Sequence, residues 1–365
     1  MKGLVAAVGK PDAARTWSGT PRHIVTALSE QCDGQITGLD LRGASLLSLV
    51  ARLVARARWL VKATEPRALL ALNWSSTLRR QLRVQAYDWV LIMGSGGRRV
   101  ESAIPTFLLM DSTIPLWSRL GGWHPSELEF RLAVRWEAEC VRRATHVFVI
   151  SHWVKNSIVA DYGVDAQRVT VIHTGYEGEG ERFAHGDYSQ RRLLFVGKEG
   201  ERKGLASVIR MFQALKRMLP DATLTVVSDT GRTHLPGVTF LKGVTRQHLD
   251  QLYSEASVFI MPAYYEPWGL VYLEAMSHGT PILLNREQAM AHELDLLGCS
   301  GGSIRVADNA DALLRATYEE LRDPSNLAKR GALARSAAQL FSWQRTAGMI
   351  RAVAVDHLAL KGAQN

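Results

Sequence analysis

Short apolar runs alternate with amphipathic stretches of helical length along the whole chain, and this alternation limits the fold more than any other feature. Buried strands that alternate with helices form βαβ units, which build parallel sheets with helices on both faces. The expected strands are Gly3–Val8, Ile36–Leu39, Trp89–Met93, Thr106–Met110, Val147–Ile150 and Val169–Ile172, followed by Leu193–Val196, Leu224–Val227, Val258–Met261, Ile282–Leu284 and Ser303–Val306. The expected helices lie near 21–31, 44–63, 75–86, 127–143 and 152–162, and then near 204–218, 246–256, 269–278, 309–322, 326–340 and 343–361. The sequence therefore predicts an α/β protein with two Rossmann-like, doubly wound parallel-sheet domains.

A polar, glycine-rich stretch, His173–Gln190, separates the two sets of strands and has the composition of a linker. We expect an N-terminal domain at 1–175, a linker at 176–190 and a second domain at 191–342. A last helix within 343–365 follows the second set. Open α/β sheets bind ligands beyond the carboxyl ends of their strands. The expected site is therefore a cleft that the two domains face.

The excess positive charge of the chain is local. Its 365 residues include 44 Lys and Arg against 35 Asp and Glu, a net charge of +9. Ten of the basic residues fall within 51–100, where Glu65 and Asp88 are the only acidic ones. Such a region favours a local anionic partner, namely a phosphate, a lipid headgroup or a nucleic acid. The three cysteines are widely spaced and odd in number, which argues against a disulfide framework or a zinc site.

Several function classes are disfavoured by motifs that the sequence lacks. No pair of the form Asp-x-Asp occurs, although a carboxylate-bound divalent metal on a nucleotide diphosphate usually needs such a pair. No GxxxxGK[ST] phosphate-binding loop occurs, and the loop after the first strand lacks GxGxxG. No apolar run reaches about 18 residues, and the first one is too short for a signal peptide. We expect a cytoplasmic protein that binds no metal.

The segment 195–204, FVGKEGERKG, leads from an expected strand through a glycine-containing loop into a helix. Gly197 allows the backbone to approach a ligand closely, and the following helix begins with free N–H groups. Lys198 and Lys203 can flank a diphosphate as point charges. The alternative is a solvated loop whose lysines face water.

The segment 261–276, MPAYYEPWGLVYLEAM, ends a strand and opens a helix, with two glutamates eight positions apart. Gly269 permits a tight turn, and the N–H groups from Gly269 through Leu270 to Val271 can bind phosphate. Glu266 lies in the loop and Glu274 in the helix, where each carboxylate can accept hydrogen bonds from hydroxyl groups. A solvated surface role is the alternative for Glu266, whereas the apolar neighbours of Glu274 indicate a carboxylate that is paired or bound.

These segments resemble the retaining glycosyltransferases of family 4, which have the GT-B architecture. The Glu-x7-Glu from Glu266 to Glu274, with Pro-Trp-Gly-Leu inside it, is the most specific mark, and FVGKEGERKG is similar to the family's phosphate loop, with Lys198 where arginine is usual. The segments 17–21, WSGTP, and 341–343, FSW, are similar to the family's amino-terminal glycine loop and to the entry of a final helix that crosses back to the first domain.

The resemblance implies a role for each matched residue. Glu266 is expected to hold hydroxyls of the donor sugar, Glu274 the ribose, and Lys198 and Lys203 the diphosphate. Gly19 is expected near the diphosphate from the first domain. Trp268 and Gly243 complete the expected donor site, although the strand and loop at 237–244 that contain Gly243 fit an ordinary edge strand equally well.

Asp111 marks a departure from the family pattern, because it stands where many members carry a histidine near the donor sugar. A carboxylate accepts hydrogen bonds from sugar hydroxyls but cannot donate them as imidazole can. We expect a catalytic role for Asp111 beside Lys198, Lys203 and Glu266. The alternative for Asp111 is an ordinary helix N-cap.

The resulting hypothesis is a metal-independent, retaining glycosyltransferase without a cofactor. It moves a hexose-type sugar from a nucleoside-diphosphate sugar to a hydroxyl acceptor, in polysaccharide, glycolipid or glycoconjugate biosynthesis. The alternatives are a nucleotide-sugar epimerase or a phosphorylase on the same fold, or a non-catalytic nucleotide-sugar-binding subunit. The acceptor is expected to be a saccharide or a lipid-linked molecule rather than a nucleic acid. The basic region 44–83 either contacts an anionic membrane surface peripherally, or packs its apolar side on the sheet.

Overall fold

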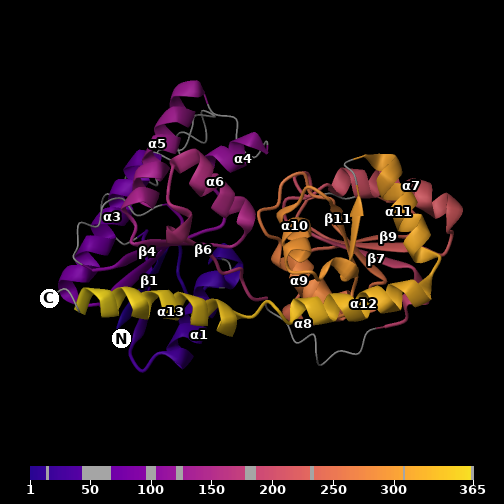
Figure 1. The fold of residues 1–365 in the computed structure, drawn as a ribbon. Helices are drawn as coiled ribbons and strands as arrows, with labels where there is room; N and C mark the ends of the chain where they lie inside the picture. The colour runs from indigo at the N-terminus through magenta and orange to yellow at the C-terminus, as the bar shows by residue number, and fades with distance from the viewer. Residues whose placement is uncertain are drawn as a thin grey trace. The chain divides into compact units, whose positions relative to one another are not determined.

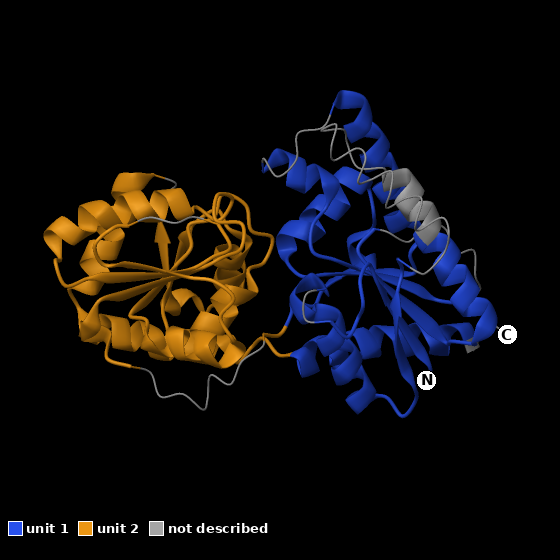
Figure 2. Ribbon diagram, turned by 180° about the vertical axis from the view of Figure 1, so that it is seen from behind, with its two compact units in different colours: residues 1–174, 343–365 blue, residues 175–342 orange. Residues whose placement is uncertain are grey.

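The chain folds into two compact units (Figures 1 and 2). The computed structural model describes residues 1–13, 16–42, 67–95, 104–120, 126–176, 186–230, 234–306 and 309–362, with the side chains of 67–73 and 362 excepted. The first unit comprises Met1–Thr174 together with Trp343–Asn365, and the second comprises Gly175–Ser342. The helix expected at 44–63 and most of the expected linker at 176–190 lie outside the described residues.

The first unit contains a six-stranded parallel sheet in the order β2-β1-β3-β4-β5-β6. Every residue of β1, β3 and β5 is buried, because helices cover the sheet on both faces, and this explains why these strands are continuous apolar runs. The strands are β1 (Gly3–Ala7), β2 (Ile36–Asp40), β3 (Trp89–Met93), β4 (Thr106–Met110), β5 (His146–Val149) and β6 (Val169–Val171).

The helices of this unit begin and end where the sequence offers suitable caps. Ser126 and Glu129 form a reciprocal capping box at the start of α5, and α6 ends at Gly163, whose φ of 64° suits glycine. The helices are α1 (Thr20–Gln31), α3 (Arg67–Val84), α4 (Ile114–Arg119), α5 (Glu127–Arg143), α6 (His152–Tyr162) and α13 (Trp343–Gly362), with 3-10 turns η1 (Thr16–Gly19) and η2 (Ala166–Arg168).

The last helix, α13, belongs to the first unit although it follows the second along the chain. It packs against α1, where the indole ring of Trp343 stacks on His23 with the ring centroids 4.9 Å apart (Figure 1). The side-chain amide of Gln31 also donates a hydrogen bond to the carbonyl of Gln344, at 2.8 Å. The predicted return of the final helix to the first domain is confirmed.

The second unit contains a six-stranded parallel sheet in the order β12-β11-β10-β7-β8-β9. The strands are β7 (Arg192–Val196), β8 (Thr223–Val227), β9 (Val238–Leu241), β10 (Val258–Ile260), β11 (Ile282–Asn285) and β12 (Ser303–Val306). Counted within the unit, this is the dinucleotide-fold order 3-2-1-4-5-6, in which the order of the strands reverses at the neighbouring parallel pair β7 and β10. The predicted class of two Rossmann-like domains is confirmed.

Helices cover both faces of this sheet (Figure 1). Helices α7 and α11 pack together on one face, while α8, α9 and α12 lie on the other. The bounds are α7 (Leu205–Met218), α8 (Arg246–Glu255), α9 (Leu270–Ser277), α10 (Ala289–Leu296), α11 (Ala310–Leu321) and α12 (Pro324–Ala338), with 3-10 turns η4 (Tyr188–Gln190) and η5 (Ser300–Gly302). The described end of the expected linker packs on this unit, since the Tyr188 hydroxyl donates to the carbonyl of Gly279 at 2.7 Å.

The buried His146 at the start of β5 makes the stability of the first unit depend on pH. Its ring lies 5.9 Å from that of His357 on α13, and its Nε2 is 2.8 Å from the Thr170 hydroxyl. Burial, followed by the nearby positive charges of His357, Arg168 and Lys155, lowers the pKa of His146 to about 4. The unfolded chain therefore takes up this proton at a higher pH than the folded one.

We expect this histidine to destabilise the fold as the pH falls below about 6.5, its ordinary pKa, with the loss growing until the folded protein is protonated near pH 4. At pH 5 the loss is about 2 kcal/mol relative to neutral pH. Urea denaturation of the wild type and of His146→Gln at pH 7.5 and pH 5 measures it, because every other group is common to both proteins. If the free energies of unfolding of the two proteins differed by the same amount at both pH values, His146 would not be the source of the pH dependence.

Candidate functional site

The candidate site of the second unit lies where β7 and β10 run side by side and their following loops diverge. The two strands pair in parallel, with Val258 opposite Leu193 and Phe259 opposite Leu194. The loop 197–204 leaves β7 for α7, and the loop 261–269 leaves β10 for α9. Ligands of doubly wound sheets bind at such a reversal of strand order. Both predicted donor-binding segments thus meet at the edge where a ligand is expected.

Glu266 and two cations form the centre of this site. The Nζ atom of Lys203 lies 3.3 Å from Oε2 of Glu266, and the guanidinium Nη1 of Arg202 lies 3.5 Å from the same oxygen. The side chains of Lys203 and Glu266 are only 14% and 10% exposed, so solvent screens their interaction weakly. Glu266 is therefore a paired, buried carboxylate rather than a solvated surface acid.

Arg202 is anchored on both sides of this cluster. Its Nε donates to Glu199 at 2.9 Å, and its Nη1 donates to the carbonyl of Tyr265. Burial alone would lower the pKa of Arg202, but the carboxylates of Glu266 and Glu199 outweigh burial and raise that pKa. The guanidinium is thus a permanent charge at the site. The sequence points to the two lysines of this loop as diphosphate contacts, but it does not point to Arg202.

The glycine at 197 explains how Lys203 reaches Glu266. A Cβ atom built on Gly197 would lie 2.6 Å from Cδ of Lys203, so the lysine stem crosses the space that any other residue would fill. Lys198, by contrast, is exposed. The two lysines that the sequence treats alike therefore stand in different surroundings.

Helix α9 begins next to Glu266. Gly269 precedes its first residue with a φ of 81°, and a Cβ there would lie 2.5 Å from the Tyr272 ring and 3.1 Å from Cγ of Glu266. Leu270 and Val271 form the partly exposed first turn. Trp268 is buried and packs edge-on against Phe341, with the ring centroids 5.6 Å apart. Trp268 therefore anchors this loop by packing on Phe341.

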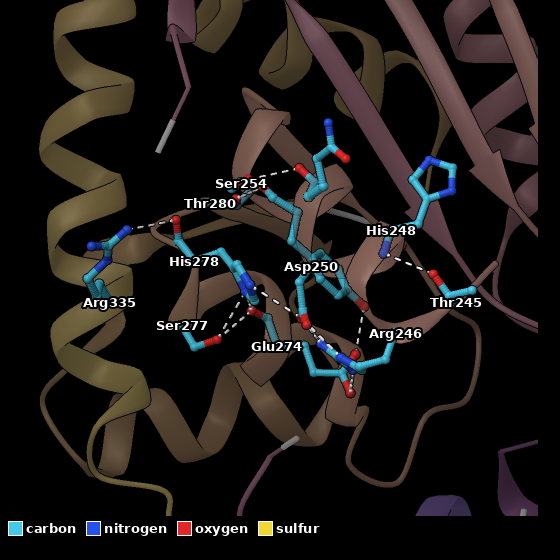
Figure 3. A network of polar contacts seen from close by, with 12 residues as sticks. Thr245, Arg246, His248, Asp250, Ser254, Glu274, Ser277, His278, Thr280 and Arg335 are labelled. Carbon is cyan, nitrogen blue, oxygen red and sulfur yellow. Dashed lines mark hydrogen bonds and ion pairs between the residues drawn. The ribbon is translucent and has the colours of Figure 1, made fainter. Parts of the chain in front are cut away.

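Glu274 lies one turn further into α9 and is paired with residues of α8 (Figure 3). Its Oε1 accepts from Nη1 of Arg246 and its Oε2 from the Tyr253 hydroxyl, both at 2.8 Å. Burial, the largest influence, raises the pKa of Glu274, while Arg246 and Tyr253 oppose it. Glu274 is thus the paired carboxylate that its apolar neighbours predict, and Arg246 is a second functional candidate to which the sequence does not point.

The remaining predicted residues belong to three different segments of the chain, two in the first unit and one in the second. Gly243 follows β9 with a φ of 65°, in open space. Gly19 precedes α1 in the first unit with a φ of 84°. Asp111 is half-buried and follows β4 directly, but it is not the cap of α4, since the Thr113 hydroxyl accepts from the N–H of Leu116. The N-cap alternative for Asp111 is wrong. The proposed roles of these residues stay predictions.

The loop after Asp111 is held by a buried polar cluster. The Thr113 hydroxyl lies 2.5 Å from that of Ser157, and Oε2 of Glu137 accepts from the N–H of Ile114 at 2.7 Å. The Tyr162 hydroxyl donates to the same oxygen. Burial, followed by the charge of Glu137, raises the pKa of Tyr162, so the phenol stays protonated. These contacts fix the backbone at the carboxyl end of β4.

Of the predicted basic region at 44–83, the structure describes the backbone only from 67 onward. On α3 the side chains of Arg79, Arg80 and Arg83 are exposed. The predicted membrane contact stays a prediction. Among the described residues, no helix combines the length and the apolar character needed to cross a membrane.

Comparison with known proteins identifies the family. A family model described as Glycosyltransferase Family 4 matches residues 35–179, and one described as Glycosyl transferases group 1 matches residues 190–323. The two matches together cover more than half of the chain. The glycogen synthase of Mycobacterium tuberculosis (strain CDC 1551 / Oshkosh) is 27% identical over an alignment of 297 positions that covers 76% of this chain and 69% of that protein.

Two further proteins are similar over different lengths. The GDP-mannose-dependent alpha-(1-6)-phosphatidylinositol monomannoside mannosyltransferase of Mycolicibacterium smegmatis is 30% identical over an alignment of 207 positions that covers 51% of this chain and 52% of that protein. The solved structure of sucrose-phosphate synthase from Thermosynechococcus elongatus superposes with a TM-score of 0.74 at 18% identity, covering 98% of this chain and 99% of that one. It shares the fold, two parallel-sheet domains of the GT-B type. With a Glycosyltransferase Family 4 model matching the first half and a Glycosyl transferases group 1 model matching the second, the chain belongs to the family 4, or group 1, glycosyltransferases.

Proposed function

We propose that this glycosyltransferase moves a hexose-type sugar from a nucleoside-diphosphate sugar to a hydroxyl acceptor, with retention of the anomeric configuration and without a metal ion. The pathway we propose is the synthesis of a polysaccharide, glycolipid or other glycoconjugate. One relative named above is GDP-mannose-dependent and acts on a phosphatidylinositol monomannoside, which supports a nucleotide-sugar donor and a saccharide or lipid-linked acceptor.

The observation that carries the proposal is the pairing of Glu266 with Lys203 and Arg202 at the reversal of strand order. A nucleotide sugar presents an anionic diphosphate next to a neutral ring with hydroxyl groups. A cluster that offers two cations and one carboxylate within hydrogen-bonding range of each other matches both parts of this ligand. The start of α9 adds the N–H groups of Leu270 and Val271 beside it.

Each of these groups has the chemistry to bind one part of the donor. Lys203, with Lys198 and the first N–H groups of α9, would neutralise the charge that grows on the departing diphosphate. Glu266 and Asp111 would accept hydrogen bonds from the sugar hydroxyls, and Glu274 from the ribose. A phosphate oxygen of the leaving group would take the proton of the acceptor hydroxyl, on the face that the phosphate leaves. Because fixed cations carry the charge stabilisation, no metal ion is needed.

The proposal is tested by turnover and by product stereochemistry. A thermal-shift panel of UDP, GDP, ADP and their sugars identifies the donor, since a bound ligand raises the melting temperature. We expect transfer to an added acceptor to persist within about 2-fold in excess EDTA, and NMR of the product to show the anomeric configuration of the donor. Strict dependence on manganese, an inverted product, or conversion of the donor without an acceptor would each contradict part of the proposal.

A further inference from the structure

A polar network between α8 and α9 holds the side chain of Glu274 in place through Arg246 (Figure 3). The guanidinium bridges two carboxylates: its Nη1 donates to Oε1 of Glu274 at 2.8 Å, and its Nε donates to Oδ1 of Asp250 at 3.0 Å. Asp250 is 3% exposed, and the fully buried His278 places Nε2 at 3.3 Å from the same Asp250 oxygen. The guanidinium of Arg246 is therefore held in one orientation, with Nη1 on Glu274 and Nε on Asp250.

Within the described part of the chain, the contacts of Glu274 leave part of its acceptor capacity unused. An ionised carboxylate offers about four lone-pair positions. The bonds from Arg246 and Tyr253 occupy one position on each oxygen. About 11% of the Glu274 side chain remains exposed. An ionised Glu274 can thus accept two further hydrogen bonds, which is the number that a vicinal diol donates, whereas a protonated one loses acceptor capacity.

The surroundings of Glu274 make its ionisation depend on Arg246. From α8, the side chain of Glu274 faces Arg246, Asp250 and Tyr253. His278, at the end of α9, places Nδ1 at 2.8 Å from the backbone carbonyl of Glu274 and Nε2 near Asp250, and its own carbonyl accepts from Arg335 of α12 at 3.0 Å. Burial lowers the pKa of His278 and raises that of Tyr253, so both stay neutral around pH 7 to 9. Among the described residues that act on Glu274, Arg246 is then the positive charge that offsets both the burial of Glu274 and the repulsion from Asp250.

We propose that Arg246 is a positioning residue for the nucleotide: it keeps Glu274 ionised and oriented, so that the carboxylate can bind the ribose diol of the donor. This inference rests on the proposed function. A purely structural ion pair that only holds α8 against α9 is the competing explanation. The two explanations differ in what happens to nucleotide affinity when the pH is raised without Arg246.

The experiment uses the full-length protein and the nucleoside diphosphate, among UDP, GDP and ADP, that the wild type binds most tightly. In Arg246→Met the aliphatic stem remains and the charge is lost. We expect its Kd, measured by titration calorimetry, to exceed that of the wild type about 10-fold at pH 7 and about 2-fold at pH 9, because Glu274 loses its proton as the pH rises. Arg246→Lys should restore most of the affinity. For Arg246→Met itself, kcat with the matching sugar nucleotide should change less than about 3-fold, because the substitution acts on nucleotide binding.

Matched variants separate the outcomes. In Glu274→Gln the Kd should be raised by a similar factor at every pH, because nothing is left to ionise. Arg192→Met, which breaks a surface pair with Glu255 of α8 at 3.3 Å, should leave the Kd unchanged. A Kd ratio for Arg246→Met that is the same at both pH values, or no rescue by lysine, overturns the inference.

The same measurements distinguish this inference from the proposed function. Wild-type binding of a nucleoside diphosphate without transfer of any sugar would count against the proposed function alone. Tight binding and transfer combined with a pH-independent Arg246→Met would count against the role of Arg246 alone. No binding of any nucleoside diphosphate by the wild type would overturn both.

Discussion

With Glu266 replaced by glutamine, we expect kcat/KM for the donor to fall about 100- to 1000-fold, while the affinity for the nucleoside diphosphate stays the same or increases. The substitution keeps the shape of the side chain and removes its charge. A hydrogen bond to a charged, prepositioned group near the reacting centre contributes about 3–4 kcal/mol to the transition state, which is a factor of 100 to 1000 in rate. The diphosphate should bind at least as tightly as in the wild type, because Lys203 and Arg202 lose the carboxylate that partly neutralises their charge.

Steady-state kinetics with the donor and calorimetry with the corresponding nucleoside diphosphate measure the two effects. Glu199→Gln is a matched control, because Glu199 pairs with the same Arg202 but is 70% exposed. We expect that control to change kcat/KM less than about 3-fold, as for an ordinary surface ion pair. Equal losses in the two variants, or a Kd that weakens along with the activity of Glu266→Gln, would show that Glu266 serves the fold of the loop rather than the sugar.

Most of the fold could be predicted because its signals are local. Strands buried on both faces appear as continuous apolar runs, and the predicted strands at Trp89–Met93, Thr106–Met110 and Ser303–Val306 have the observed bounds. Helices α5 and α6 likewise lie where the pattern placed them, each preceded by a serine cap. Helix α4 was missed, because its six residues are too few to show a helical period.

The candidate site was predictable in part, for the same reason. Glu266 and Glu274 stand out by their spacing within one strand–loop–helix segment. Arg246 does not, because its partner Glu274 is 28 positions away and only the packing of α8 on α9 brings them together. The spacing of Arg246 and Asp250, four residues apart on a helix, was a local signal for an ion pair, but it gave no indication of the second carboxylate.

The sequence also does not indicate which of the two lysines, Lys198 or Lys203, is largely buried next to Glu266. Lys198 and Lys203 flank the same glycine-containing loop, and each is a plausible phosphate contact. The difference arises from the absence of a side chain at Gly197, which lets the stem of Lys203 cross to Glu266 and lose most of its exposure. This geometry concerns atoms six residues apart in an irregular loop, for which no periodic pattern exists.

Lys203→Met is expected to produce the opposite signature from Glu266→Gln. Methionine keeps an unbranched stem over Gly197 and removes only the charge. Hydrogen bonds to charged groups contribute about 1.5–3 kcal/mol, so we expect the Kd for the nucleoside diphosphate to rise about 10- to 100-fold. The loss should be larger in kcat/KM, about 100- to 1000-fold, because the negative charge grows as the sugar–phosphate bond breaks.

Calorimetry and donor kinetics on Lys203→Met, beside Lys329→Met as an exposed-lysine control on α12, test this expectation. Removing the cation should weaken the binding of the diphosphate, and removing its carboxylate partner should not, although both changes break the same 3.3 Å ion pair. A loop that the ion pair merely held together would respond alike to the two changes. Nucleotide affinity that falls equally in Lys203→Met and Glu266→Gln would therefore remove the electrostatic basis of the proposed reaction, whereas opposite shifts would show that the cation serves the phosphate and the carboxylate the sugar.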